Sequence, residues 1–248
     1  SDPVNFTVVV DTTAPATSTL VVTNDVTSAT IPAGGYSSDA TPTLSGVAEA
    51  NAIVTVRDGN TVLGSVTADA EGRWSYVSTT LNQGLHTLSV TATDVAGNVS
   101  GATSTTLIVD SVAPVAVSGL NAANNNGSAL VAIAAGGTTS DATPLLRGTA
   151  EAGSVVTIRD GDTVLGSVTA GSGGAWSFVT PALAEGAHTF NVTASDAAGN
   201  VSPNATLTLT VDTTPPAAVS NLVVTDDAAP NTGPLTNGAV TNDTTPVL

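Results

Sequence analysis

The segment TATDVAGNVS at residues 91–100 returns almost unchanged as TASDAAGNVS at residues 193–202. The same offset of 102 residues also repeats the segments SDATP, RDG and TVLGSVTA. Laid side by side without gaps, residues 38–110 and 140–212 agree at about 44 of 73 positions. Repetition over this length indicates two copies of one structural unit, so the chain is read as a tandem array.

Each copy contains seven short segments in which apolar and polar residues alternate, the pattern of half-buried β-strands. In the first copy the first four strands are expected near 17–23, 42–48, 52–57 and 61–67, with residues 24–40 forming a long loop. A sixth strand is expected around Leu88, Val90 and Ala92, and a seventh that ends at Val109. The fifth carries Trp74 and Tyr76, which are expected in the core. Seven short strands in about 100 residues, without a helical pattern, predict an all-β fold of tandem immunoglobulin-like sandwiches arranged end to end.

Three linker motifs set the expected domain boundaries: DTTAP at 11–15, DSVAP at 110–114 and DTTPP at 212–216. Proline shortly after an Asp-Ser/Thr turn ends one strand and begins an extended segment. The predicted division is a last strand of a preceding repeat (1–11), repeat 1 (12–110), repeat 2 (111–212) and the first part of an incomplete third repeat (213–248). The chain is therefore expected to be a piece of a longer array.

Composition excludes several classes of function. Twenty acidic residues face four arginines, and the net charge of −16 disfavours nucleic acid and anionic membrane surfaces as partners while suiting divalent cations. The absence of cysteine excludes disulfides and thiol chemistry. No apolar run approaches the roughly 18 residues needed to span a bilayer, so membrane insertion is not expected.

The sequence contains no recognisable catalytic motif, because it lacks the G-x-S-x-G elbow, the phosphate-binding loop and H-E-x-x-H. The two histidines, His86 and His188, are equivalent residues of different repeats and cannot share one site. A structural role is expected for both, and the chain is not expected to be an enzyme.

The linker DTTAP, the strand opener SDATP and the turn DVAGNVS resemble the bacterial immunoglobulin-like repeats of large Gram-negative adhesins and biofilm-associated proteins secreted by type I systems. The resemblance covers the whole chain. It implies an extracellular, calcium-loaded, rigid stalk at the bacterial cell surface. The implied partners are neighbouring repeats of the same chain and, through a distal tip, host-cell or biofilm-matrix components, and the chain is expected to be monomeric.

The residues themselves also indicate whether calcium could bind where the repeats meet. Successive antiparallel strands place alternate loops at opposite poles, so Asp39, Asp58 and Asp110 are expected to approach Glu151, Asp196 and Asn200 where the repeats meet. Calcium takes six to eight oxygen ligands, and unbridged carboxylates at one junction would repel. The predicted metal-ligating residues are Asp11, Asp39, Glu49, Asp58, Asp94, Asn98, Asp110, Asp141, Glu151, Asp160, Asp196, Asn200 and Asp212.

Turn chemistry is the alternative for every one of these residues, because Asp and Asn stabilise turns through hydrogen bonds to nearby backbone. Three classes of function likewise remain open: a structural stalk segment, a repeat that itself binds a receptor, a glycan or another copy, and a spacer attached to an extracellular hydrolase. Close similarity of the two copies favours the stalk, since a specialised site usually makes one copy diverge.

Overall fold

The computed structural model describes residues 7–230 and 232–247, and these residues contain β-strands but no helix. The chain divides into two parts, residues 1–212, which hold both complete repeats, and residues 213–248. Most of the strand expected at 1–11 lies outside the described residues, and residues 7–11 form no strand. The described chain also has no helix of the length and apolarity that a bilayer crossing requires.

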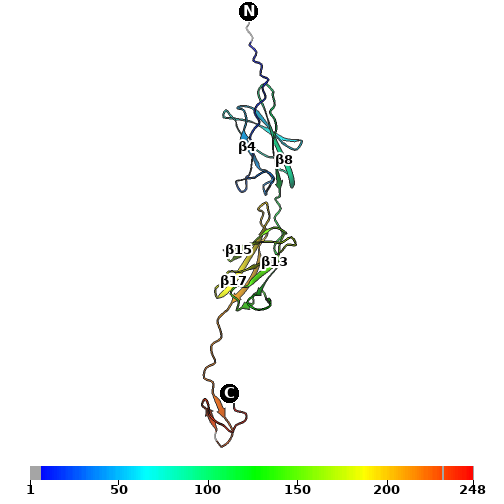
Figure 1. The fold of residues 1–248 in the computed structure, drawn as a ribbon. Coiled ribbons are helices and arrows are strands. Elements are labelled where there is room, and N and C mark those ends of the chain that lie inside the picture. Colours follow the sequence, from blue (N-terminus) through cyan, green and yellow to red (C-terminus); the bar gives the residue numbers. More distant parts are fainter. Residues whose placement is uncertain (1–6, 231, 248) are drawn as a thin grey trace, which may run out of the picture. The chain divides into compact units, whose positions relative to one another are not determined.

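Repeat 1 is a sandwich of two sheets, with β4 and β8 marking one sheet each in Figure 1. The four-stranded sheet has the order β2 (Ala29–Thr30), β1 (Val21–Asn24), β4 (Thr43–Val47) and β7 (Arg73–Val77). The five-stranded sheet has the order β3 (Gly35–Ser37), β9 (Thr103–Val109), β8 (Gly84–Thr93), β5 (Ile53–Asp58) and β6 (Thr61–Thr67).

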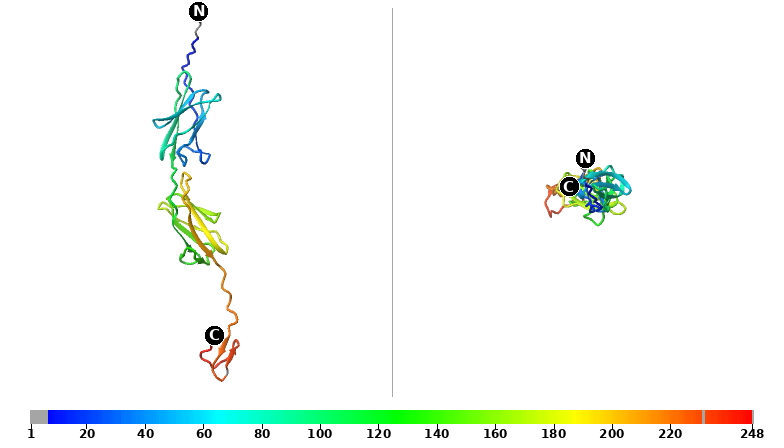
Figure 2. Two further views of the ribbon diagram at one scale, coloured as in Figure 1. Left: turned by 180° about the vertical axis from the view of Figure 1, so that it is seen from behind. Right: turned by 90° about the horizontal axis from the view of Figure 1, so that it is seen from above.

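Repeat 2, the green-to-yellow unit in the left view of Figure 2, reproduces this topology. Its four-stranded sheet has the order β11 (Val131–Ile133), β10 (Ser118–Asn124), β13 (Leu145–Thr149) and β16 (Ala175–Val179). Its five-stranded sheet has the order β12 (Thr138–Thr139), β18 (Ala205–Val211), β17 (Gly186–Ser195), β14 (Val155–Asp160) and β15 (Thr163–Thr169). The predicted all-β, immunoglobulin-like fold class is confirmed.

The prediction of an unbroken loop at 24–40 was wrong, because this segment contains two further strands. β2 pairs with β1, and β3 crosses to the other sheet, where Gly35 pairs in parallel with Leu107 of β9. Strands of two and three residues are too short to show an alternating pattern, so the sequence did not reveal them. Their effect is to close the sandwich: the chain leaves one sheet and hydrogen-bonds to the last strand of the other.

Alternate residues of the strands build the core between the sheets. Leu88, Val90 and Ala92 of β8 are fully buried, and so is Leu44 of β4. In repeat 2, Phe190 is buried at the position equivalent to Leu88. Burial of each of the Leu, Val and Phe side chains among these contributes about 1.5–3 kcal/mol. Trp74 and Trp176 are also buried, as expected, whereas Tyr76 lies at the margin of the core.

Tyr76 is held against the edge strand β6 by a close approach that requires glycine. A Cβ atom on Gly64 would lie 2.5 Å from the Tyr76 hydroxyl, so no larger residue fits there. The hydroxyl donates to the Leu63 carbonyl at 2.7 Å. In repeat 2 the ring of Phe178 occupies the same place over Gly166, at 2.8 Å from an added Cβ.

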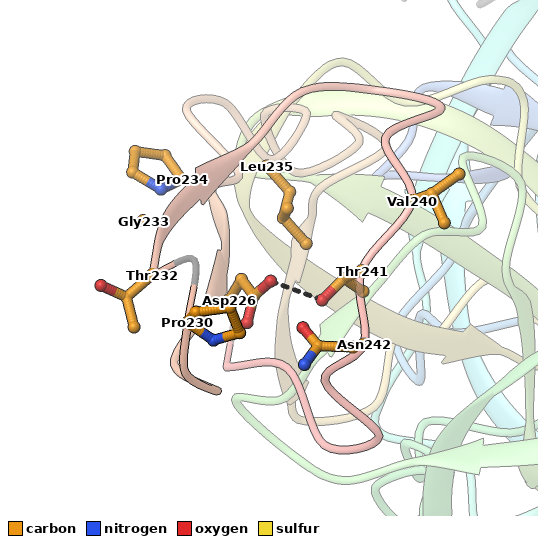
Figure 3. Close-up of a pocket in the computed structure, with 9 residues that line it drawn as sticks. All are labelled: Asp226, Pro230, Thr232, Gly233, Pro234, Leu235, Val240, Thr241 and Asn242. Atoms are coloured by element: carbon orange, nitrogen blue, oxygen red, sulfur yellow. Dashed lines mark hydrogen bonds between the residues drawn. The ribbon is translucent and has the colours of Figure 1, made fainter.

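The part formed by residues 213–248 has its own small sheet, in which β19 (Val224–Asp226) pairs with β20 (Gly233–Leu235). Thr241 donates to the Asp226 carboxylate at 2.6 Å across an open cavity (Figure 3). The Asp243 carboxylate accepts the backbone N–H groups of Thr245 and Asp227. The same loop pattern occurs around Asp141 in repeat 2, so this segment folds locally like the beginning of a repeat.

Candidate junction site

The turn between β8 and β9 is built around one aspartate. The Asp94 carboxylate accepts the backbone N–H of Asn98 at 2.8 Å and its side-chain amide at 2.7 Å. The hydrogen bond from the Asn98 side chain is the main reason that the pKa of Asp94 is lowered below its ordinary value. Asp196 and Asn200 repeat these contacts between β17 and β18. Both carboxylates are thus engaged by their own turns.

The asparagine of this turn also holds the linker that leads into its own repeat. Asn200 donates through Nδ2 to the carbonyl oxygen of Asp110 at 2.7 Å, and Asn98 donates to the carbonyl oxygen of Asp11 at 3.2 Å. We call this contact the asparagine latch. The sequence placed Asn200 near Asp110 as a metal ligand, and the structure brings the two together as hydrogen-bond donor and acceptor.

A second contact holds the same linker from repeat 1. Gln83, in the loop before β8, donates to the Ser111 hydroxyl at 2.7 Å and accepts the Ser111 backbone N–H at 3.0 Å. Sequence reasoning missed Gln83, because a lone glutamine in a loop carries no motif. The linker start at Asp110 and Ser111 is therefore held by one side chain from each repeat.

Three of the predicted metal-ligating residues line one open cavity at this linker. Its lining consists of Tyr36, Asp110, Glu151, Ala152, Gly153, Ser154, Asp196 and Ala197. The lining includes three carboxylates and no basic residue. Tyr36, which the sequence did not single out, contributes from β3 with 48% of its surface exposed.

Asp39 and Asp141 do not line this cavity, because their carboxylates are buried in their own loops. Asp39 is 5% exposed and accepts the backbone N–H groups of Asp25 and Thr41, each at 2.8 Å. Asp141 is engaged in the same way by Asn125 and Thr143. These aspartates organise the loop that crosses between the sheets.

Asp58 and Asp160 also lie away from this cavity. Each carboxylate contacts the histidine of its own repeat and also accepts a backbone N–H, from Thr87 at 3.2 Å and from Thr189 at 3.1 Å. We therefore leave Asp58 and Asp160 out of any cation site.

The remaining predicted residues lie on the linkers and on one exposed turn. The Asp11 and Asp110 carboxylates accept the backbone N–H groups of Thr13 and Val112, as expected for capped turns. The backbone N–H of Asp212 donates to the Thr139 carbonyl at 2.8 Å. Glu49 is exposed beside a shallow cavity of repeat 1.

The oxygen donors of the junction cavity suit a hard cation such as calcium in kind. Their arrangement is more open than a metal cage: within residues 7–230 and 232–247, no three His, Asp or Glu side chains gather closely enough to hold an ion. Asp110 and Glu151 are the members of this cavity whose carboxylates are least engaged, since Asp196 is bound by its own turn.

Comparison with known proteins identifies the family. The family model described as a bacterial Ig-like domain matches residues 11–111 and again residues 116–213. The chain belongs to the bacterial Ig-like domain family. No protein of curated function matches this pair of bacterial Ig-like repeats.

Solved structures with similar folds have low sequence identity to the bacterial Ig-like repeats. The fibronectin(III)-like modules of CbhA from Clostridium thermocellum align with 77% of this chain and 93% of their own, at 20% identity and a TM-score of 0.44. The BSP domain of a biofilm-associated protein aligns with 74% of this chain and 29% of its own, at 22% identity and a TM-score of 0.28. The human OSCAR ligand-binding domain aligns with 79% of this chain and 99% of its own, at 13% identity and a TM-score of 0.32.

Proposed function

We propose that this chain is a stalk segment of a bacterial cell-surface adhesin, in which successive repeats act as struts that hold a distal adhesive part away from the cell. The observation that carries the proposal is the asparagine latch, which occurs at both linkers: Asn98 to Asp11 and Asn200 to Asp110. A module that fixes its own leading linker in every copy is suited to transmitting direction along an array. An extracellular location follows from this role.

Calcium binding at the junction is the finer part of the proposal. Asp110, Glu151 and Asp196 line one cavity without a basic residue, so their charges repel. A calcium ion held by the Asp110 and Glu151 carboxylates would offset two of these three negative charges and join a linker residue to a loop of repeat 2. Extracellular calcium modules bind with dissociation constants of roughly 10⁻⁴–10⁻³ M. The repeats are expected to stay folded without calcium, because each has its own core.

Small-angle scattering of residues 12–212 tests both parts. With calcium, the maximum dimension should be longer and better defined than with a chelator. Glu151→Gln should remove the difference, whereas Glu49→Gln, the equivalent residue at the other end of repeat 1, should leave it intact. Identical scattering with and without calcium would reject the calcium part and leave the latch as the source of stiffness. A broad range of shapes in both conditions would reject the stalk.

A further inference from the structure

The two histidines of the chain make the same pair of contacts in both repeats. His86 Nδ1 lies 2.7 Å from Oδ2 of Asp58, and its Nε2 lies 2.8 Å from the carbonyl oxygen of Asn82. His188 Nδ1 lies 2.6 Å from Oδ2 of Asp160, and its Nε2 lies 3.0 Å from the carbonyl oxygen of Ala184. Asn82 and Ala184 are different residue types, so both repeats keep the contact with the backbone carbonyl although the residue at that position changes.

Both partners of each ring can only accept hydrogen bonds, since one is a carboxylate and the other a backbone carbonyl. A neutral imidazole has a single N–H and can satisfy only one of them, whereas the imidazolium ion donates from both nitrogens. In the neutral ring the carboxylate keeps the proton on Nδ1. The bare Nε2 lone pair then faces the carbonyl oxygen of Asn82 or Ala184, which is repulsive. The geometry is thus satisfied only by the charged ring.

The charged surroundings of the two rings favour the same state. Asp58 faces His86 from β5, β9 presents the apolar Leu107 opposite it, and the loop 78–83 carries no charged residue. Around His188, Asp160 faces the ring from β14, β18 presents Leu209, and the adjoining loop carries Glu185.

These groups set the direction of the histidine titrations. Partial burial of the His86 ring acts to lower its pKa, but the hydrogen bonds to Asp58 and Asn82 and the charge of Asp58 raise it above the ordinary 6.5. Partial burial of the His188 ring likewise acts to lower its pKa. The contacts with the Ala184 carbonyl and Asp160 outweigh this effect, so the pKa of His188 is also raised.

Each ring joins two segments that are distant in sequence. Asp58 ends β5 at the hairpin to β6, and Asn82 belongs to the loop before β8, where Leu81 is anchored in the core. The next residue after Asn82 is Gln83, whose side chain holds Ser111 of the linker. In repeat 1 the carbonyl group that His86 contacts therefore belongs to the residue next to Gln83, whose side chain fixes the linker.

We propose that His86 and His188 are proton-dependent staples, which fasten the loop before their strand to the neighbouring hairpin when charged and release its carbonyl when neutral. In repeat 1 this release loosens the hold of Gln83 on the linker. Because the folded pKa is raised, the staple is fully formed below pH 6.5 and is lost as the pH rises through the folded pKa above that value. Mildly acidic surroundings tighten the linker, and alkaline surroundings loosen it.

The titration itself can be followed by NMR on the imidazole nitrogens of the intact chain, which gives two separate sets of signals because it has only two histidines. Both midpoints should lie above 6.5. Asp58→Asn should lower the His86 midpoint and leave His188 unchanged, and Asp160→Asn should do the reverse. Midpoints at or below 6.5 in the wild type would overturn the proposal, as would a His86 midpoint that Asp58→Asn does not lower.

The link to the linker has a separate readout in hydrogen exchange at the Ser111 amide, which donates to Gln83. Its protection factor, corrected for intrinsic pH dependence, should fall about two- to tenfold between pH 6 and pH 8, the change expected for weakening by one ordinary hydrogen bond. His86→Gln should abolish this pH dependence, and His188→Gln should preserve it. Equal protection of Ser111 at both pH values in the wild type would show that the staple does not reach the linker.

Discussion

Asn200 donates its side-chain amide to the carbonyl oxygen of Asp110 at 2.7 Å, across 90 residues of sequence, while its backbone N–H and the same amide bind Asp196. One asparagine therefore serves both its own turn and the linker that enters its repeat. The equivalent contact of Asn98 with Asp11 shows that this is a property of the repeat.

Replacing Asn200 by alanine should free the linker. The Asp110 carbonyl would lose its donor, and loss of a hydrogen bond of this kind costs about 0.5–1.5 kcal/mol. Hydrogen exchange measured by mass spectrometry should become faster in peptides covering residues 110–116. The matched variant Asn98→Ala should affect the linker at 11–15 and leave 110–116 as in the wild type. Unchanged exchange at 110–116 in Asn200→Ala would mean that the latch does not restrain the linker.

The two repeats differ at the contact between Tyr76 and Leu63, which offers a reciprocal experiment. Tyr76→Phe removes the 2.7 Å hydrogen bond and should destabilise repeat 1 by about 1 kcal/mol. Phe178→Tyr adds a hydroxyl over the equivalent strand and should stabilise repeat 2 by a similar amount. Denaturant unfolding of each repeat alone measures both. If Phe178→Tyr destabilises repeat 2, the hydroxyl has no acceptor within reach there.

Trp176 is 5% exposed in the core of repeat 2. Trp176→Ala should lower the free energy of unfolding of repeat 2 by about 3–5 kcal/mol, because it leaves a large cavity. Repeat 2 should then unfold well before repeat 1 in a thermal scan of the chain, since the two cores are separate. Trp74→Ala is the matched variant and should reverse the order. Loss of both repeats in one transition in either variant would contradict independent folding.

Acid should weaken the turn between β8 and β9. The pKa of Asp94 is lowered in the folded protein, mainly by the hydrogen bond from the Asn98 side chain, so its contribution to stability is present above the ordinary value of 3.8. That contribution is lost as the pH falls from 3.8 through the folded pKa. Asp94→Asn should therefore reduce the loss of stability of repeat 1 in this window, measured by denaturant unfolding at several pH values. An identical acid profile for the variant would exclude Asp94 as a contributor.

The alternating pattern predicted the strands well because each core strand has one buried face: Leu88, Val90 and Ala92 face inward, as expected. The sequence did not predict β3, because three residues paired in parallel with β9 leave no period to detect. For the junction, the internal repeat identified the aspartates that both copies retain but not their contacts. Whether Asp39 reaches the linker or its own loop depends on backbone N–H groups of Asp25 and Thr41, which no side-chain pattern reveals.

The histidine contacts illustrate the same limit. His86 and Asp58 are 28 residues apart, and they meet because β5 pairs with β8 in a register that sets Asp58 opposite Leu88. Once that register is known, the neighbourhood of His86 follows. The sequence alone shows that both repeats have this histidine and this aspartate, but not the register that brings them together.

The junction between repeats 1 and 2 is expected to behave as a strut, and single-molecule energy transfer across it tests this most directly. The chain has no cysteine, so Val62→Cys and Val164→Cys, at equivalent exposed positions of the two repeats, provide specific labelling sites. A single narrow distance distribution is predicted for the otherwise wild-type chain in calcium. It should broaden when Gln83→Ala and Asn200→Ala are combined. A distribution equally broad with and without these two side chains would show that the junction is not held as a strut by Gln83 and Asn200.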